Sequence, residues 1–237
     1  IEFARKGAQL AICSTSEKSI KATVEELEKM EATFMAQPVD VSKFDQVEVF
    51  VKAVLEKFGR IDILVNNAGI TRDGLLMRMS DGDWDAVLAV NLKGPFELSR
   101  LVAQRLIQAG KPGSIVNVAS VLGQGSSPLQ GVYGMTKAAL ISMTQTLAVE
   151  WGGAGIRVNA IAPGLVETRL AGALVGNKEI VSRFTSRTSS GRRGTRSRAA
   201  RGFRPCPRCA PGCRRWASTR NSSRPRACCA RWTPSAC

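Results

Sequence analysis

The sequence predicts an α/β protein in which a parallel sheet is covered by helices on both faces. Over residues 1–180, short apolar runs typical of buried strands alternate with segments whose apolar residues recur at helical spacing. This alternation is typical of a doubly wound parallel sheet, because parallel strands need a crossover, usually a helix, to connect them. A chain of 237 residues is long enough to bury one substantial core around such a sheet.

The expected elements follow one another in a regular order. Gly7 and Gly59 each end a helical segment, as glycine commonly does. Buried strands are expected at residues 8–13, 33–38, 61–65, 114–119 and 157–162. Helices are expected at residues 17–30, 44–58, 81–91 with a continuation past Pro95 to 109, and 133–151. Residues 40–42, Asp-Val-Ser, are expected to form a turn that caps the next helix.

Charge and cysteine content divide the chain near residue 180. From Ile180 onward there is no Asp, Glu or Lys, but there are 15 arginines. They account for the whole formal charge of +15, because the other 19 basic residues balance the 19 acidic ones. Six of the seven cysteines also lie there, from Cys206 to Cys237. This composition has no period that would form a core, so residues 181–237 are predicted to be disordered and residues 1–180 to form one domain.

The composition excludes several classes of protein. The chain has no histidine, which excludes a Ser-His-Asp triad, a Cys-His dyad and any histidine-ligated metal. The spacing of the six late cysteines is too irregular for a zinc site, so no metal is expected. No apolar run approaches the roughly 18 residues needed to span a membrane. One cysteine in the domain, Cys13, is typical of a reducing compartment, which predicts a cytoplasmic protein.

Four residues form a candidate catalytic group. Tyr133 and Lys137 are one helical turn apart and share a face, and an ammonium beside a phenol lowers the pKa of the phenol. Ser120 ends a strand, where its hydroxyl can hydrogen-bond a substrate carbonyl next to the tyrosine. Asn91 lies in a helix that it can locally interrupt, where it can hold a water near the lysine. Together they are predicted to polarise a ketone and protonate its oxygen, leaving the carbon open to hydride.

Five sequence features together resemble those of the short-chain dehydrogenase/reductase family over residues 1 to about 180. They are Asn66-Asn67-Ala68-Gly69, the Asn of Val90-Asn91-Leu92, a Ser thirteen residues before a Tyr-x-x-x-Lys pair, that pair itself, and Pro163-Gly164. The resemblance implies a single-domain Rossmann-type fold and an NAD(P)-dependent oxidoreductase. Residues 67–79 further resemble the 3-oxoacyl-carrier-protein reductases of fatty-acid synthesis. This implies NADPH-dependent reduction of a 3-oxoacyl thioester to the 3-hydroxyacyl form.

The resemblance also implies a cofactor site. The residues expected to line it are Asp40 and Val41 beside the adenine, Asn67, Ala68 and Gly69 along the ribose, Tyr133 and Lys137 at the nicotinamide ribose, and Pro163, Gly164, Val166 and Thr168 at the nicotinamide. Asn67 is also expected to brace its strand. Ser14 and Thr15 end the first strand with no carboxylate before Glu17, which favours NADP(H), with NAD(H) as the alternative.

For partners, the resemblance implies an acyl-carrier protein, or a small ketone, as substrate, with Lys111 among the basic groups that meet an acidic carrier. It implies a homotetramer built on the helices near residues 95–109 and 134–151. The family begins with a strand and a glycine-rich turn, whereas this chain begins inside the following helix. We therefore expect the first strand and turn to be missing, two sheet edges to be exposed and cofactor binding to be weakened. The abrupt change near Ile180 predicts a shift of the reading frame, which resequencing of the DNA would test.

Alternative functions remain open from the sequence. Within the same class, the chain would act on another small ketone or alcohol, or on a sugar alcohol. In another class, it would be a basic protein whose tail contacts nucleic-acid phosphates without specific recognition, or an inactive fragment. A salt titration of DNA binding, set against thioester-dependent oxidation of NADPH, would separate the enzyme from the binding protein.

Overall fold

The computed structural model describes residues 1–125 and 127–166. The chain divides into two units, Ile1–Gly164 and Leu165–Cys237, and every helix and strand described below belongs to the first. The predicted domain boundary near residue 180 and the predicted disordered tail, residues 181–237, lie outside the described residues. They therefore remain predictions.

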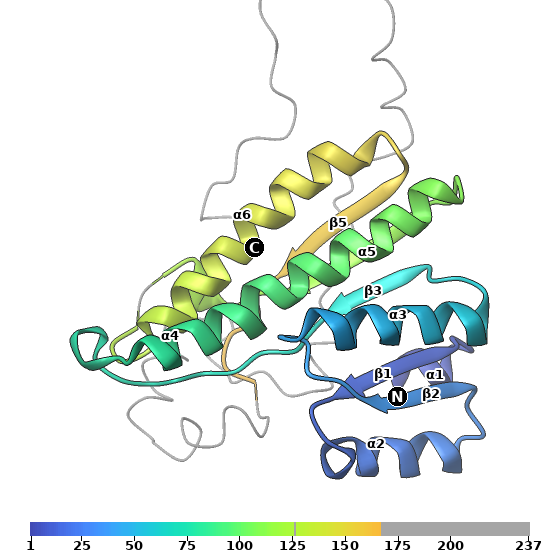
Figure 1. Ribbon diagram of the computed structural model, residues 1–237, viewed down its shortest axis with the longest axis horizontal. Helices are drawn as coiled ribbons and strands as arrows, with labels where there is room; N and C mark the ends of the chain where they lie inside the picture. Colours follow the sequence, from blue (N-terminus) through green and yellow to red (C-terminus); the bar gives the residue numbers. More distant parts are fainter. Residues whose placement is uncertain (126, 167–237) are drawn as a thin grey trace, which may run out of the picture. The chain divides into compact units, whose positions relative to one another are not determined.

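Five strands form within the described residues, and each pairs with its neighbour in parallel. They are β1 (Leu10–Ser14), β2 (Phe34–Pro38), β3 (Ile63–Asn66), β4 (Gly113–Val118) and β5 (Ile156–Ile161). β1 and β2 form one sheet, while β3, β4 and β5 form a second in that order. The arrows of both sheets point toward the same side (Figure 1). The predicted parallel α/β architecture is confirmed, and the carboxyl ends of all the strands meet along one side of the first unit.

The two sheets each have an open edge in the part of the chain that the structure describes. There, β1 pairs only with β2, and β3 pairs only with β4. On β3 the side chains of Ile63 and Val65 are 56% and 41% exposed, although strands of a doubly wound sheet are normally covered on both faces. The expectation of two unpaired edges holds for these residues.

Six α-helices surround the strands within the described residues: α1 (Glu2–Arg5), α2 (Glu17–Lys29), α3 (Phe44–Phe58), α4 (Asp81–Leu88), α5 (Gly94–Gln108) and α6 (Gly131–Gly152). α3 has the predicted bounds and ends at Gly59, whose φ of 73° is the left-handed conformation that glycine adopts without strain. α2 begins where the Ser16 hydroxyl accepts a hydrogen bond from the Ser19 amide. None of the described helices is long and apolar enough to cross a membrane.

The cap predicted before α3 differs from the observed one. Asp40 does form a turn, because its carboxylate accepts hydrogen bonds from the amide and the hydroxyl of Ser42. The N-cap residue of the helix, however, is Lys43, one residue after Ser42, and its side chain makes no capping hydrogen bond. Gln46, in the first turn, reaches back and accepts from the Asp40 amide at 2.9 Å. The side chain of Gln46, which belongs to the helix, therefore links the turn at Asp40 to the helix by a hydrogen bond.

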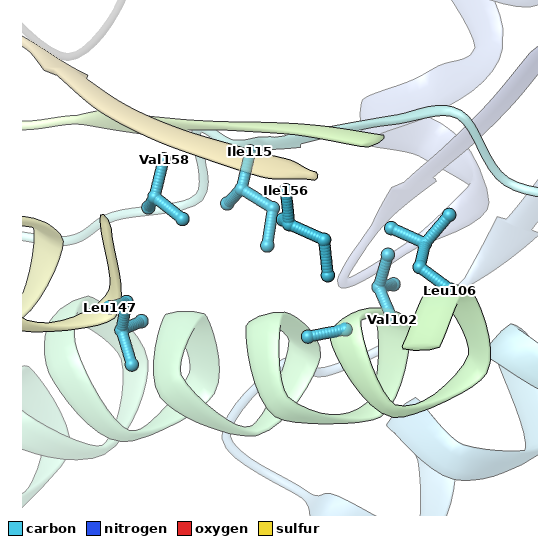
Figure 2. Packing of buried hydrophobic residues seen from close by; sticks show 7 residues of the cluster. Val102, Leu106, Ile115, Leu147, Ile156 and Val158 are labelled. Carbon is cyan, nitrogen blue, oxygen red and sulfur yellow. The ribbon is translucent and has the colours of Figure 1, made fainter. Parts of the chain in front are cut away.

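The main core lies between α5, α6 and the three-stranded sheet. Val102 and Leu106 point from α5 toward Ile115 of β4 and toward Ile156 and Val158 of β5 (Figure 2). Leu147 of α6 joins the same cluster, and Trp151 packs against it. Each such aliphatic side chain contributes about 1.5 to 3 kcal/mol when fully buried. This cluster fixes α6, which carries Tyr133 and Lys137, against the sheet.

A second core cluster lies beneath α3. Val47, Phe50 and Val54 of α3 pack with Val39 and Val41, which follow β2. Partly buried residues from elsewhere join them, namely Cys13 of β1, Met35 of β2, Phe58, Ile61, Val90, Leu98 and Leu101. α3 therefore packs against side chains of β1, β2 and α5, and against Ile61, which lies two residues before β3.

A buried polar network braces the centre of the second sheet. Asn66 Nδ2 donates to Asn117 Oδ1 at 2.8 Å and to Ser99 Oγ at 3.0 Å, and Asn117 Nδ2 donates to Thr144 Oγ1 at 2.8 Å. All four residues are buried, and hydrogen bonds between buried partners avoid the cost of desolvated polar groups. The strand is therefore braced by Asn66. The sequence-based assignment of this role to Asn67 was wrong, because Asn67 is the next residue along and is exposed.

Candidate active site

Ser120 and Tyr133 come together where β4 ends and α6 begins. Ser120 lies two residues after the end of β4. It is 8% exposed, and its hydroxyl accepts a hydrogen bond from the Leu122 amide at 3.2 Å. It caps the short helix η3 (Val121–Gly123), which packs against α6. The phenol of Tyr133, in the first turn of α6, lies close enough to the Ser120 hydroxyl for that group to lower its pKa. Parts of the chain thirteen residues apart thus place two hydroxyls at one point.

Two glycines allow η3 to approach the backbone of α6. A Cβ atom on Gly123 would lie 2.7 Å from the carbonyl carbon of Lys137 and 2.9 Å from the amide nitrogen of Ala138. A Cβ atom on Gly134 would lie 3.0 Å from the carbonyl oxygen of Leu122. A side chain at Gly123 would therefore clash with main-chain atoms that cannot rotate away. The absence of these side chains sets the separation between Ser120 and Tyr133.

Lys137 is buried beside this pair. Its side chain is 4% exposed, and its Nζ donates to the Val118 carbonyl at 2.7 Å. The same Nζ lies 5.6 Å from the centroid of the Tyr133 ring. Burial lowers the pKa of the Lys137 amine to about 8, because an ammonium loses hydration there. An ammonium has three donors, so two remain to hold hydroxyl groups of a ligand.

The expected lowering of the tyrosine pKa is not found. Burial raises the pKa of the Tyr133 phenol, the hydrogen bond from Ser120 lowers it, and the Asp73 carboxylate raises it further. Desolvation of the phenolate therefore outweighs the favourable groups. The predicted net lowering of this pKa was therefore wrong for the protein without cofactor, because burial of the phenol outweighs any effect of Lys137, whose own pKa is lowered by burial.

Replacing Asp73 by Asn should lower the pKa of Tyr133. A carboxylate near a phenol disfavours phenolate, so removing its charge makes ionisation easier. Because Tyr133 is the only tyrosine in the chain, its phenolate absorbance can be titrated without interference from a second tyrosine. Asp81→Asn, an exposed carboxylate in the first turn of α4, serves as the matched control. Equal shifts in the two variants would show a general charge effect and not a local one.

A pH dependence of stability should follow from Lys137. Its amine has a pKa of about 8 in the folded chain against an ordinary 10.5, so between these values the unfolded chain binds more protons. The free energy of unfolding should therefore rise with pH in that window. From pH 8 to pH 10 the contribution of Lys137 to this rise should be roughly 2 kcal/mol. Urea titrations of wild type and Lys137→Met should differ by this slope, and parallel slopes would contradict the assignment.

Asn91 lies in a π-helical turn, η2 (Ala89–Lys93), which separates α4 from α5. The predicted local interruption of the helix is therefore present, and such turns are frequent at functional sites. Its side chain is fully buried and braces a neighbouring loop: Oδ1 accepts from the Ile70 amide at 2.8 Å, and Nδ2 donates to the Ile70 carbonyl at 2.9 Å. Nδ2 also donates to Thr136 Oγ1, which donates to the Tyr133 carbonyl. Both amide hydrogens of Asn91 are thus used inside the protein.

The residues predicted to contact a cofactor lie at the carboxyl ends of the strands. Ser14 ends β1, Thr15 follows it, and Asp40 and Val41 follow β2. Asn67, Ala68 and Gly69 follow β3, where the first two are exposed. Pro163 lies close to Ser120, because its carbonyl accepts from the Val121 amide at 3.1 Å, and Gly164 comes next. Val166 belongs to the second unit and Thr168 lies outside the described residues, so their roles remain predictions.

Gly69 provides a direct test of whether these residues suit a nicotinamide ribose. A Cβ atom on Gly69 would lie 3.4 Å from Asn91 Oδ1 and 3.6 Å from Lys137 Nζ. At Gly69 the backbone of the loop after β3 therefore lies next to the buried Lys137 amine, with no side chain of the loop between them. An ammonium with unused donors beside a bare backbone suits the hydroxyls of a ribose. The residues present fit that part of the cofactor.

Several residues at the site were not found from the sequence. Asp73 acts on the Tyr133 phenol, Gln130 is 6% exposed and donates to Asp73 at 3.5 Å, and Thr136 links Asn91 to Tyr133. Asp73 also lines a cavity of about 330 Å³ with Arg72 and Asp83, which are hydrogen-bonded to each other. Within residues 1–125 and 127–166, no three His, Cys, Asp or Glu side chains cluster as metal ligands. Gln130 could have been found from the sequence, because it is a polar residue within one helical turn of Tyr133.

Comparisons with known proteins agree with this geometry. The model of a protein family described as Enoyl-(Acyl carrier protein) reductase matches residues 1–202. The 3-oxoacyl-[acyl-carrier-protein] reductase FabG of Thermotoga maritima is 46% identical over 166 residues, which cover 70% of this chain and 67% of that protein. The reductase of the same name from Staphylococcus epidermidis is 38% identical over 175 residues, or 73% of this chain and 71% of that protein.

A solved structure is also similar. A gluconate 5-dehydrogenase from Burkholderia cenocepacia, crystallised with NADP and tartrate, superposes with a TM-score of 0.75 at 33% sequence identity. The match covers 81% of this chain and 75% of that one. The names of these proteins differ in substrate, and the family description names enoyl reduction. These similarities therefore establish the family of the chain but not its substrate.

Proposed function

Because the chain belongs to the short-chain dehydrogenase/reductase family, a family of oxidoreductases, we propose that it reduces the ketone of a 3-oxoacyl thioester carried on an acyl-carrier protein. The observation that carries the chemistry is the meeting of Ser120, Tyr133 and Lys137 at the carboxyl ends of the strands. The substrate is supported by the two FabG relatives, which are 46% and 38% identical to this chain.

The proton in this proposal comes from Tyr133. Its raised pKa keeps the phenol protonated at neutral pH, so it can act as a general acid toward the ketone oxygen. The Ser120 hydroxyl, which lies beside the phenol, would hold the same oxygen and orient the carbonyl. The nicotinamide supplies the hydride to the carbonyl carbon when it is bound. The C=O bond becomes C–OH, with the hydroxyl proton taken from Tyr133.

Lys137 would act in two ways. Its unused donors would hold the nicotinamide ribose, and its charge would stabilise the phenolate that remains after proton transfer. In the proposed relay, Asn91 places a water that returns a proton toward the lysine. Since both amide hydrogens of Asn91 are used by Ile70 and Thr136, such a water would be held by Asn91 oxygen atoms.

For the cofactor we propose NADP(H), with NAD(H) as the alternative. Ser14 and Thr15 stand at the end of β1, just before the N-terminus of α2, where hydroxyls and helix amides favour an anion such as the 2′-phosphate. The NADP in the similar gluconate 5-dehydrogenase supports this choice. Asp40 and Val41 would flank the adenine, while Pro163, Gly164, Val166 and Thr168 would hold the nicotinamide.

A second candidate function is oxidation of a sugar acid or sugar alcohol by the same residues. The similarity to the gluconate 5-dehydrogenase, with a TM-score of 0.75, favours it. The proton chemistry would run in reverse, with Tyr133 accepting the alcohol proton. Nothing in the Ser120–Tyr133–Lys137 group distinguishes the two substrates, because each would place one carbonyl or alcohol carbon at the reacting position.

The assay that tests the proposal compares both substrates with the same chain. NADPH oxidation is followed with an acetoacetyl thioester of the carrier protein, and NADP⁺ reduction is followed with gluconate. The proposal expects turnover of the thioester and a lower kcat/KM for gluconate. Turnover of gluconate alone would replace the proposed function by the second candidate.

A homotetramer in the cytoplasm completes the proposal. α5 and α6 would form its interface, supported by an apolar groove of about 620 Å³ to which both helices contribute. The groove is lined by residues of α4, η2, α5 and α6, namely Asp85, Leu88, Ala89, Leu92, Lys93, Phe96, Ala139 and Met143. An apolar groove of this size on a helix pair is typical of a surface that another protein covers. The cytoplasmic location rests on the unpaired Cys13.

A further inference from the structure

The segment that follows β3 is attached to the beginning of α6. The Gly74 amide donates to the Leu129 carbonyl at 2.7 Å, and Gln130 Nε2 donates to the Asp73 carboxylate at 3.5 Å. A Cβ atom on Gly131, the first residue of α6, would lie 2.8 Å from the Leu76 side chain, so Leu76 lies directly over it. The segment 73–77 is thus held against residues 129–131, which precede Tyr133 by two to four positions.

The phenol of Tyr133 lies within reach of this segment. Side chains on a helix lean toward its N-terminus, so the Tyr133 ring is directed toward residues 129–131. The effect of the Asp73 carboxylate on the Tyr133 pKa is independent evidence that segment 73–77 lies near the reacting oxygen. A substrate whose ketone rests on Tyr133 would therefore extend over this segment or away from it.

The exposed surface of this segment is apolar. Leu75, Leu76 and Met77 are 49%, 52% and 88% exposed, and Leu129 is 52% exposed. We call these four residues the apolar lip. Asp73 of this segment and Arg78, which follows it, line the 330 Å³ cavity, and Leu75 of the lip lines the same cavity. Apolar side chains this exposed usually mark a binding surface when they cluster beside a site.

Leu129 also has an unusual backbone. Its φ of 68° is in the left-handed region, which costs a leucine about 1 to 2 kcal/mol and which Asn or Gly adopts more easily. An Asn at position 129 would adopt this backbone conformation with less strain. A leucine here therefore places an apolar side chain beside the active site at a conformational cost.

We infer that the apolar lip binds the acyl chain of the substrate, so that the enzyme prefers long 3-oxoacyl thioesters to short ones. The inference rests on the proposed function, since it assigns a path to the chain of the substrate that Tyr133 protonates. It also opposes a polyhydroxylated substrate, because the lip offers no hydrogen-bonding side chain to replace water around sugar hydroxyls.

The test uses the double variant Leu129→Asn/Met77→Ser. Asn accepts the left-handed backbone, and Leu129 and Met77 are both more than half exposed, so neither change removes a buried side chain. Burying one methylene group changes binding by about fourfold, so loss of contact with two of them lowers the preference about tenfold or more. Val149→Ser, at an apolar residue 84% exposed on the distant part of α6, is the matched control.

Two measurements are made on wild type, double variant and control. The first is the ratio of kcat/KM for 3-oxodecanoyl and acetoacetyl thioesters. General damage would lower both values equally, whereas loss of the lip lowers their ratio. The second is the calorimetric Kd of decanoyl and butyryl thioesters, which have no ketone and need no turnover.

The expected result is a preference for the long chain in wild type and in Val149→Ser, reduced about tenfold in the double variant by both measurements. No chain-length preference in wild-type binding, or the same preference in the double variant, would overturn the inference. If no thioester is reduced but the binding preference is present and lost in the double variant, the proposed function fails and the lip stands as an acyl-chain site.

Discussion

Replacing Tyr133 by Phe is expected to lower the kcat for ketone reduction by about a hundredfold to ten-thousandfold, the usual contribution of a positioned general acid. The change removes one hydroxyl and keeps the ring. The half-buried aromatic surface beside Lys137 is therefore retained, and the Ser120 hydroxyl keeps its hydrogen bond from the Leu122 amide. The loss should appear in kcat, because the proton is transferred only when the oxygen gains charge.

The measurements are kcat and KM with the acetoacetyl thioester, together with the midpoint of urea unfolding. Ser142→Ala, which removes an exposed hydroxyl from the same helix, should leave kcat within about twofold of wild type, since a surface substitution of this kind has little effect. A Tyr133→Phe variant with more than a tenth of wild-type kcat would mean that the proton comes from another group.

Replacing Gly123 by Ala is expected to destabilise the fold by about 1 to 3 kcal/mol and to lower activity at the same time. The added Cβ would lie 2.7 Å from the Lys137 carbonyl carbon and 2.8 Å from its oxygen. Because both are backbone atoms, η3 has to move away from α6. Ser120 caps η3, so its hydroxyl would move away from Tyr133.

Gly125→Ala is the matched control, because a Cβ there would meet nothing within 4 Å. Urea unfolding and kcat are measured on both variants. If the two variants behave alike, the close approach of η3 and α6 does not position the catalytic pair. A loss of stability without a loss of kcat would mean that Ser120 keeps its place although η3 has moved.

The sequence predicted the fold well where local pattern and packing agree. The helix at 44–58 has apolar residues on one face and ends at Gly59, and it was predicted with its observed bounds. The predicted strand at 114–119 differs from β4 by one residue. Such elements depend on periodicity and on glycine, and both can be seen in a single sequence.

The site was predicted less completely, because its details depend on contacts between distant parts of the chain. Asn66 and Asn67 are neighbours in sequence, but alternate residues of a strand face opposite sides, and only Asn66 meets Ser99 and Asn117. The direction of the Tyr133 pKa depends on how deeply the ring is buried and on Asp73, sixty residues earlier. Sequence spacing predicted the Tyr133–Lys137 pair but neither of these effects.

The division of the strands between two sheets has a consequence for how the first unit opens. β4 has a hydrogen-bonded neighbour on either side, while β1 has β2 as its partner among the described residues. The region from β1 to β2 would therefore behave as a separate cooperative unit, joined to the remainder through side chains beneath α3. It would unfold locally at a lower free energy than β4. Ser14 and Thr15 would then lose their folded positions before the Ser120–Tyr133 pair is disturbed.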